Sequence, residues 1–220
     1  MNEILVPFLV SDAVASTPLL LAAIGELIVE KTGVLNLGVE GMMLAGAIAA
    51  FATAHRTGMP FLGVAAGLGA GVALSLLFGV VSLTFRANQT ATGLALTIFG
   101  RGFSALAGAG FVGIPAPALP KLHVPGLSDI PVLGPVLFGH DALVYLALAM
   151  LAAVAWAIRA THLGLVLRAV GDSHDAAHAL GYRVVAIRYA AVAFGGAMAP
   201  WRDWPGPICR SPTHRSGRRT

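Results

Sequence analysis

The side chains that could do chemistry in this chain are few, and they interrupt long apolar runs. Glu26 and Glu40 flank a glycine-containing break, and Arg101 lies inside a later apolar run. Placing an ionisable side chain inside the membrane costs free energy, so such a residue is first considered as part of a functional site. One interpretation is that the three residues form a charge relay or a polar path. The other is structural: Glu40 hydrogen-bonds backbone amides at the break, and Arg101 neutralises a buried acid such as Glu26 or Glu40.

His174 and His178 are four residues apart, a spacing that can bind a metal ion from one face of a helix. No third ligand stands at a suitable spacing, so we favour an exposed pair on a polar helix and predict no metal site. The chain also lacks the motifs G-x-x-x-x-G-K-S/T, H-E-x-x-H and G-x-S-x-G. It therefore has no P-loop for ATP, and nothing in it predicts an enzyme or a bound cofactor. Any energy coupling would come from a partner or an ion gradient.

The composition indicates a membrane protein. Hydrophobic residues make up 57% of the chain, charged residues only 11%, and the mean hydropathy is +0.81. A soluble domain has roughly 25% charged residues, so this chain lacks the polar residues that coat a soluble surface. Its net charge of +4 arises wholly in residues 200–220, which hold five arginines and one aspartate. The basic balance therefore gives no reason to expect nucleic acid as a partner.

Several apolar runs reach the ~20 residues that a helix needs to cross a bilayer. We therefore predict an all-α fold: a polytopic membrane helix bundle over residues 1–199, with about five to six spans and a short cytoplasmic helix. The expected spans are residues 13–29, 41–55, 61–85, 92–111 and 141–158, with a sixth that begins at 184.

The distribution of basic residues predicts the orientation of the spans. Alternating the spans puts six Lys or Arg residues on one side and two on the other. Because cytoplasmic loops carry the excess of positive charge, the first side is predicted to be cytoplasmic. Residues 112–140, with six prolines, then form an extramembrane loop outside. The six are Lys31, Arg86, Arg159, Arg168, Arg183 and Arg188, and the two are Arg56 and Lys121.

The stretch 171–181 has the sequence Gly-Asp-Ser-His-Asp-Ala-Ala-His-Ala-Leu-Gly, which predicts a short polar helix between two apolar segments. We expect Asp172 to cap its start and Gly181 to terminate it. A helix with this many polar groups cannot lie in hydrocarbon, so we expect it to face water. A soluble partner could bind it there. The residues expected to share one face of this helix are Ala176, Ala177 and Leu180.

Three glycines within the longest apolar run predict close helix packing. Gly63, Gly67 and Gly71 are four residues apart, so they lie on one helix face and let a neighbouring helix approach. A polar cluster that contains Asn88 and Gln89 precedes the fourth expected span. Its favoured role is to cap that helix, and the alternative is that it lines a polar path.

Residues 200–220 differ abruptly from the apolar sequence before them, with four prolines and five arginines. One interpretation is a disordered basic end near the membrane. We favour the other, in which a shifted reading frame has replaced the continuation of a membrane helix. The reason is that the apolar run from residue 184 stops too early for a span.

Three stretches, in order along the chain, resemble one known family. The stretch 32–44, Thr-Gly-Val-Leu-Asn-Leu-Gly-Val-Glu-Gly-Met-Met-Leu, resembles a signature of bacterial ABC-transporter permeases. That family serves branched-chain amino acids, ribose-type sugars and nucleosides. The stretch 87–100, Ala-Asn-Gln-Thr-Ala-Thr-Gly-Leu-Ala-Leu-Thr-Ile-Phe-Gly, resembles its second signature, and 167–182 resembles the cytoplasmic coupling loop. The sequence Asn-Leu-Gly-Val-Glu-Gly resembles the motif of the nucleoside and simple-sugar branch more than that of the amino-acid branch.

The resemblance covers about residues 13–198. It implies a permease subunit that moves a nucleoside or simple sugar by ATPase-driven alternating access. It also implies three protein partners: a cytoplasmic ABC ATPase subunit that binds the ATP, a second permease subunit (identical or not) and an extracytoplasmic solute-binding protein. The fourth implied partner is the lipid of the bacterial inner membrane, which the chain is expected to cross several times. The implied ATPase-coupling residues are Arg168, Gly171, Asp172, Ala176, Ala177, Leu180 and Gly181. The candidate residues of the substrate path, chosen for their polarity at depth, are Asn36, Glu40, Asn88, Gln89 and Arg101.

The chain departs from the family pattern in two places. The coupling loop usually carries Glu-Asn-Pro where this chain has Asp172, Ser173 and His174, so its helix start is expected to differ. The pattern is lost after residue 198, so the chain is expected to lack the family's C-terminal third. Two alternative functions stay open: the three charged residues Glu26, Glu40 and Arg101 suggest an ion-coupled carrier or channel, and the lost pattern suggests a permease fragment without transport.

Overall fold

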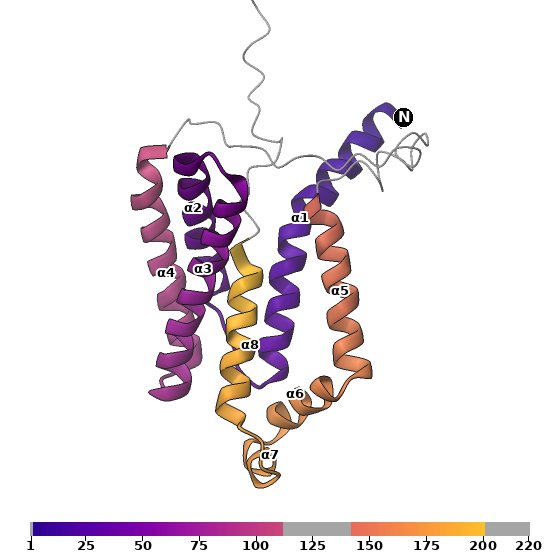
Figure 1. The fold of residues 1–220 in the computed structure, drawn as a ribbon, viewed down its shortest axis with the longest axis vertical. Helices are drawn as coiled ribbons and strands as arrows, with labels where there is room; N and C mark the ends of the chain where they lie inside the picture. The colour runs from indigo at the N-terminus through magenta and orange to yellow at the C-terminus, as the bar shows by residue number, and fades with distance from the viewer. Residues whose placement is uncertain (1, 112–141, 201–220) are drawn as a thin grey trace, which may run out of the picture.

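The computed structural model describes residues 2–111 and 142–200, and the regular structure within these two ranges is entirely helical. The helices are α1 (Asn2–Lys31), α2 (Val39–Thr57), α3 (Pro60–Gly79), the π-helix η1 (Val80–Thr84), α4 (Gln89–Gly108), the 3-10 helix η2 (Ala109–Phe111), α5 (Ala142–Ala160), α6 (His162–Asp172), α7 (His174–Ala179) and α8 (Val184–Met198). The long helices stand side by side, and α6 and α7 lie together at one end of the bundle (Figure 1). The predicted all-α bundle is confirmed. The expected proline-rich loop and the tail from residue 201 lie outside the described residues.

Two of the described helical stretches, Pro60–Thr84 and Gln89–Phe111, are long and apolar enough to cross a membrane. The number rises to three if the stretches Val144–Ala160 and His162–Asp172, which meet at a bend of 73°, are taken as one broken span. This is fewer than the five to six spans expected from the apolar runs. Part of the reason is that α2 carries charges in its first and last turns and that α8 has only 15 residues.

The segment 32–38 is not helical, and it runs along α4 into the bundle before α2 begins. The Leu35 N–H donates to Oε1 of Gln89, the first residue of α4, at 2.8 Å. Farther along, Gly41 of α2 lies against α4 so closely that a Cβ atom there would meet Thr97 Cα at 2.8 Å. Since a helix rises 1.5 Å per residue, Gly41 lies about 12 Å deeper along α4 than Leu35. The apolar stretch of α2, which is short for a membrane span, is therefore preceded inside the bundle by this non-helical segment.

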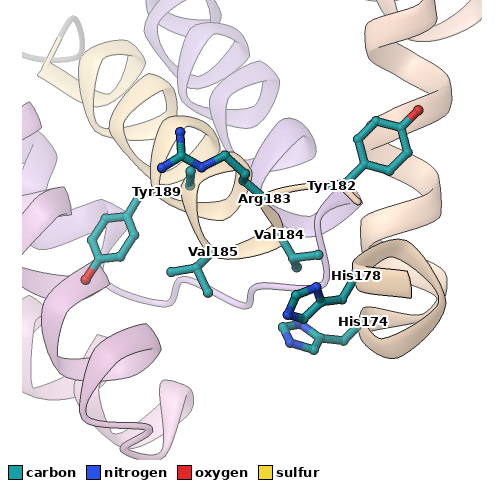
Figure 2. A pocket seen from close by; sticks show the side chains of 8 residues that line it. His174, His178, Tyr182, Arg183, Val184, Val185 and Tyr189 are labelled. Carbon is teal, nitrogen blue, oxygen red and sulfur yellow. The ribbon is translucent and has the colours of Figure 1, made fainter. Parts of the chain in front are cut away.

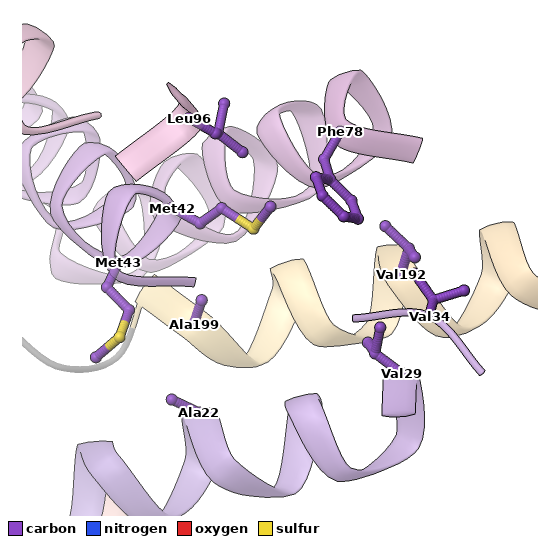
Figure 3. Close-up of a cluster of buried hydrophobic side chains, with 9 residues drawn as sticks. All are labelled: Ala22, Val29, Val34, Met42, Met43, Phe78, Leu96, Val192 and Ala199. Carbon is purple, nitrogen blue, oxygen red and sulfur yellow. The ribbon is translucent and has the colours of Figure 1, made fainter. Parts of the chain in front are cut away.

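The main apolar core lies between α1, α2, α3 and α8, with Leu96 of α4 and Val34 of the non-helical segment 32–38 at its edge, and Figure 3 shows these side chains together. Phe78, Met42 and Val192 are almost fully buried. Burial of this kind holds the long helices in one bundle. The remaining members of the cluster are Ala22, Val29, Val34, Met43, Leu96 and Ala199.

The three glycines of the predicted packing face are all buried in α3. A Cβ atom on Gly63 would meet Ala50 O of α2 at 2.6 Å, and one on Gly67 would meet Ala50 Cβ at 3.0 Å. A Cβ atom on Gly71 would meet Pro200 Cγ, just beyond α8, at 2.6 Å. The glycine face therefore packs against two different neighbours, α2 along its first half and the end of α8 along its second.

Candidate functional site

Glu40 and Arg101 form an ion pair between the first turn of α2 and the middle of α4, with 2.6 Å between Glu40 Oε1 and Arg101 Nη2. Each residue adjoins a glycine at which the two backbones touch, because a Cβ atom on Gly100 would meet the main chain of Gly41. The two side chains remain 44% and 60% exposed. A charged pair exposed at membrane depth is unfavourable in hydrocarbon, so this face needs water or another polypeptide beside it.

Two other candidate path residues hold the segment 32–38 in place. The Asn36 side chain is 2% exposed, and its Oδ1 accepts from the Gly38 N–H at 3.0 Å. Gln89 Oε1 accepts from the Leu35 N–H, as described above. Non-helical backbone needs such partners, because it lacks the hydrogen bonds that a helix makes within itself. The carbonyl oxygen of each side chain is therefore engaged within the protein.

Glu26, the third charged residue of the hypothetical relay, binds a different partner. Its Oε1 accepts from the Asn36 N–H at 3.1 Å. The structure thus brings Glu40 and Arg101 together, whereas Glu26 holds the backbone of the break. Asn88 Oδ1 accepts from the Ala91 N–H at 3.1 Å at the start of α4, which confirms the favoured capping role of Asn88.

The short polar helix of the sequence is α7, and its start differs from the prediction. Asp172 is the last residue of α6, so the expectation that it caps α7 is wrong. Ser173 is the N-cap: its backbone is extended, with φ −151° and ψ 113°, and its Oγ accepts from the Ala176 N–H at 3.3 Å. An N-cap residue needs non-helical backbone angles, which Ser173 has.

Gly181 terminates the short helix as predicted. It has φ +84°, a left-handed conformation that glycine adopts without the steric cost of a Cβ atom. Two hydrogen bonds close the turn: Gly181 N–H to His178 O at 2.9 Å, and Tyr182 N–H to Ala177 O at 3.1 Å. This pair of bonds is the Schellman arrangement that ends many helices.

The face of α7 also differs from the prediction. Ala177 is 1% exposed and packs with Val166, Val170 and Val184 in a small core of its own. Leu180 is 73% exposed, and Ala176 is exposed as well, so the three residues do not share a face. The reason is that neighbouring residues of a helix point about 100° apart, and Leu180 lies just past the end of α7.

Gly171 and Arg188 tie this end of the chain to the bundle. At Gly171 the backbone of α6 touches the end of α1, because a Cβ atom there would meet Lys31 O. Arg188 of α8 donates through Nε to Thr32 O at 3.0 Å and through Nη2 to Val170 O at 3.4 Å. A guanidinium is favourable beside the C-terminal ends of α1 and α6, where the helix dipoles are negative. We missed Arg188 from the sequence; its signal was a charge inside the last apolar run.

Arg168 stabilises the bend between α5 and α6. Its Nη2 donates to Ile158 O, in the last turn of α5, at 3.0 Å. The backbones also touch there, since a Cβ atom on Gly164 would meet the Ile158 carbonyl carbon at 2.6 Å. Arg168 therefore holds the direction in which α6 leaves the bundle.

Replacing Arg188 by alanine is expected to loosen α6 and α7 from the bundle. The change removes two hydrogen bonds from a charged donor, each worth about 1.5–3 kcal/mol. Hydrogen exchange of the amides in α6 and α7 should accelerate strongly in the Arg188→Ala variant. The matched control is Arg183→Ala, at the exposed N-cap of the same helix. Equal acceleration in both variants would contradict the role of Arg188.

His174 and His178 lie together on α7, with ring centroids 6.5 Å apart and planes nearly perpendicular. Both side chains are exposed. Among the residues that the structure describes, no group of three or more His, Cys, Asp or Glu is arranged to hold a metal ion. The geometry of the pair is that of an edge-to-face ring contact at the protein surface.

Three curated relatives are similar to this chain over most of its length. A protein provisionally named a glucose ABC transporter permease, from Haloferax volcanii, is 38% identical over 189 residues, which are 84% of this chain and 57% of that protein. The guanosine ABC transporter permease of Bacillus subtilis is 33% identical over 207 residues (88% and 64%). The nucleoside ABC transporter permease of Lactococcus lactis is 31% identical over 195 residues (83% and 61%). The chain thus spans 57% to 64% of the length of these relatives.

No solved structure matches the chain. The relatives are transporter permease subunits, not enzymes. Residues 8–200 match the family described as branched-chain amino acid transport system / permease component. The chain belongs to this family of membrane permeases.

Proposed function

We propose that the chain is the membrane-spanning permease subunit of an ABC importer and that it moves a nucleoside or a simple sugar. The family match over residues 8–200 carries the proposal. The relatives support the substrate class, because their names state glucose, guanosine and nucleosides. Such solutes are rich in hydroxyl groups, to which the Glu40–Arg101 pair offers charged acceptors and donors for strong hydrogen bonds.

In this proposal a cytoplasmic ATPase subunit binds ATP and engages α7, and alternating access follows from the movement of α7. Leu180 and Ala176 are exposed and form the contact with the ATPase. Ala177 is buried and makes α7 move together with α6 and α8. Gly171 and Arg188 connect that movement to the end of α1. From there the segment 32–38 leads directly to Glu40.

A second permease subunit, identical or not, covers the exposed face around Glu40 and Arg101 in this proposal. A solute-binding protein docks at the opposite end of the bundle, and the chain crosses the bacterial inner (plasma) membrane several times. The positive-inside rule supports the orientation in which α7 lies on the cytoplasmic side. Four members of the larger basic group lie in or near α6 and α7: Arg168 in α6, Arg183 and Arg188 at the start of α8, and Arg86 between η1 and α4.

The proposal is tested by co-purification of the tagged chain with ABC ATPase subunits from the same membrane. We expect wild type to retain a protein that carries a P-loop motif. Leu180→Asp should reduce this retention at least about tenfold, because a buried, unpaired charge at an interface costs several kcal/mol. Met59→Asp is the matched control: Met59 is 58% exposed but precedes α3, at the opposite end of the bundle. Retention that is absent in wild type, or unchanged by Leu180→Asp, would contradict the proposal.

A further inference from the structure

Two cavities of about 530 and 440 Å³ adjoin at the end of the bundle that carries α7. The larger lies between the turn from η1 to α4 and the first turns of α7 and α8, and the smaller lies between α7 and α8. Figure 2 shows the smaller one, with His174 and His178 of α7 close together and Val185 of α8 nearby. His174 and Val185 line both cavities. The charged residues in the two linings are Arg86, Arg183, Arg188 and Asp175.

Several donors in these linings are available to an anion. Arg86 makes no hydrogen bond or ion pair with the other residues that the structure describes, and its side chain is exposed. Its φ of +54° is a left-handed conformation that favours glycine, yet the position carries a guanidinium. Gln89 uses its oxygen to bind Leu35 N–H, so the two hydrogens of its amide nitrogen remain for a ligand. Arg188 is held in place through Nε and Nη2, which leaves Nη1 free to donate.

The charge of the linings selects a phosphate group. Three arginines stand against one carboxylate, Asp175, so the cavities carry a positive balance. Guanidinium groups match the oxygens of a phosphate in geometry and bind them with charge-assisted hydrogen bonds. The net positive charge of the linings would not strengthen the binding of an uncharged solute. The ligand chemistry is therefore that of a phosphate monoester or diester.

Apolar surface around the cavities distinguishes a lipid phosphate from free phosphate. Val184, Val185 and Leu83 line the two cavities, and Val185 is 50% exposed. Phe85, next to Arg86, is 74% exposed. Hydrated inorganic phosphate makes no favourable contact with such groups, whereas the glycerol and acyl chains of a phospholipid do. Basic pockets between membrane helices are typical binding sites of anionic headgroups at the cytoplasmic surface.

We infer that the two cavities bind the headgroup phosphate of an anionic phospholipid, with Arg86 as its principal charged donor. A lipid held there bridges the η1–α4 turn and α7, so it would stiffen α7 against the bundle. The inference rests on the proposed function only for the cytoplasmic orientation of this end. Binding is measured on the chain alone, so a failed co-purification with an ATPase leaves it standing.

The test is native mass spectrometry of the purified full chain in a neutral detergent. Short-chain phosphatidylglycerol is titrated in, with phosphatidylcholine of the same chain length and inorganic phosphate in parallel. We expect phosphatidylglycerol to bind best. Arg86→Gln should weaken its apparent affinity about tenfold, the loss expected for one charge-assisted hydrogen bond. Asp175→Asn, at an exposed site, should strengthen it several-fold because it removes the carboxylate that opposes the phosphate.

The matched control is Arg159→Gln, an exposed arginine in the last turn of α5 that lines neither cavity. It should change the affinity less than about twofold, since surface charge alone contributes little. Equal loss in Arg86→Gln and Arg159→Gln would overturn the site, as would equal binding of phosphatidylcholine and phosphatidylglycerol. Displacement of the lipid by millimolar inorganic phosphate would overturn the lipid as its ligand. Because Asp175→Asn is expected to raise the affinity, failure of a variant to fold cannot account for the whole set of results.

Discussion

Gly100→Ala is expected to separate α4 from α2 and to leave little folded protein. The added Cβ atom would meet the Cα, C and O atoms of Gly41, with the carbonyl carbon at 2.6 Å. These are backbone atoms of another helix, so no side chain can rotate away to make room. Overpacking of a tight contact costs about 1–3 kcal/mol, and more when the backbone must move. The same shift would pull apart Glu40 and Arg101, the neighbours of the two glycines.

The measurement for Gly100→Ala is the apparent melting midpoint of the tagged chain in detergent, followed by fluorescence-detected size exclusion. Gly102→Ala is the matched control on the same helix, because a Cβ atom there meets nothing within 4 Å. Alanine is the better helix former, so this control should melt at the same temperature or slightly higher. If both variants melt like wild type, the contact between Gly41 and Gly100 does not hold α4 to α2.

Ala177→Asp is expected to unfold α7 while leaving the long helices in place. Ala177 is 1% exposed and contacts three valines, so the new carboxylate would have no polar partner among the described residues. A buried and uncompensated charge costs about 3–5 kcal/mol. That exceeds what a helix of six residues with one N-cap bond can offset. Limited trypsin digestion reports the change, because Arg168 and Arg183 flank α7 on its two sides.

Ala176→Asp is the control for Ala177→Asp, one residue earlier and on the exposed side of α7. A carboxylate there lies in the first turn of the helix, where the helix dipole favours a negative charge. We therefore expect digestion of Ala176→Asp at the wild-type rate and faster cleavage at both arginines in Ala177→Asp. Equal cleavage of the two variants would mean that Ala177 is not buried in solution. The contrast also explains why Leu180, rather than Ala177, is the position at which to probe a partner.

Local features of the sequence predicted the elements and their ends well. Asn88 precedes its helix with a side chain that can accept from a free N–H, and it caps α4. Gly181 can adopt a positive φ, and it ends the short helix. Both predictions need only a few neighbouring residues, since the hydrogen bonds of a cap join groups close together in the chain. The expectation that Asp172 caps the short helix failed because α6 extends through Asp172, which leaves Ser173 as the N-cap of α7.

Partners far apart in the sequence could not be predicted in this way. Arg101 pairs with Glu40 and not with Glu26, and that choice depends on the contact between Gly41 and Gly100. In the sequence, Glu26 and Glu40 are equally charged, and nothing in the sequence says how far either lies from Arg101. Arg188 was counted only for its charge, although in the fold it joins the ends of α1 and α6.

The class of this protein, an all-helical membrane permease, followed from the sequence by itself, because hydropathy and motif order are properties of the chain in any conformation. The prediction of the cytoplasmic side likewise uses only the positions of Lys and Arg along the chain. The tertiary structure alone decided which charges meet, which face of α7 is buried and where two cavities adjoin. The physical reason is that each of these depends on backbones that approach within contact distance, and such approach is set by packing across the whole bundle.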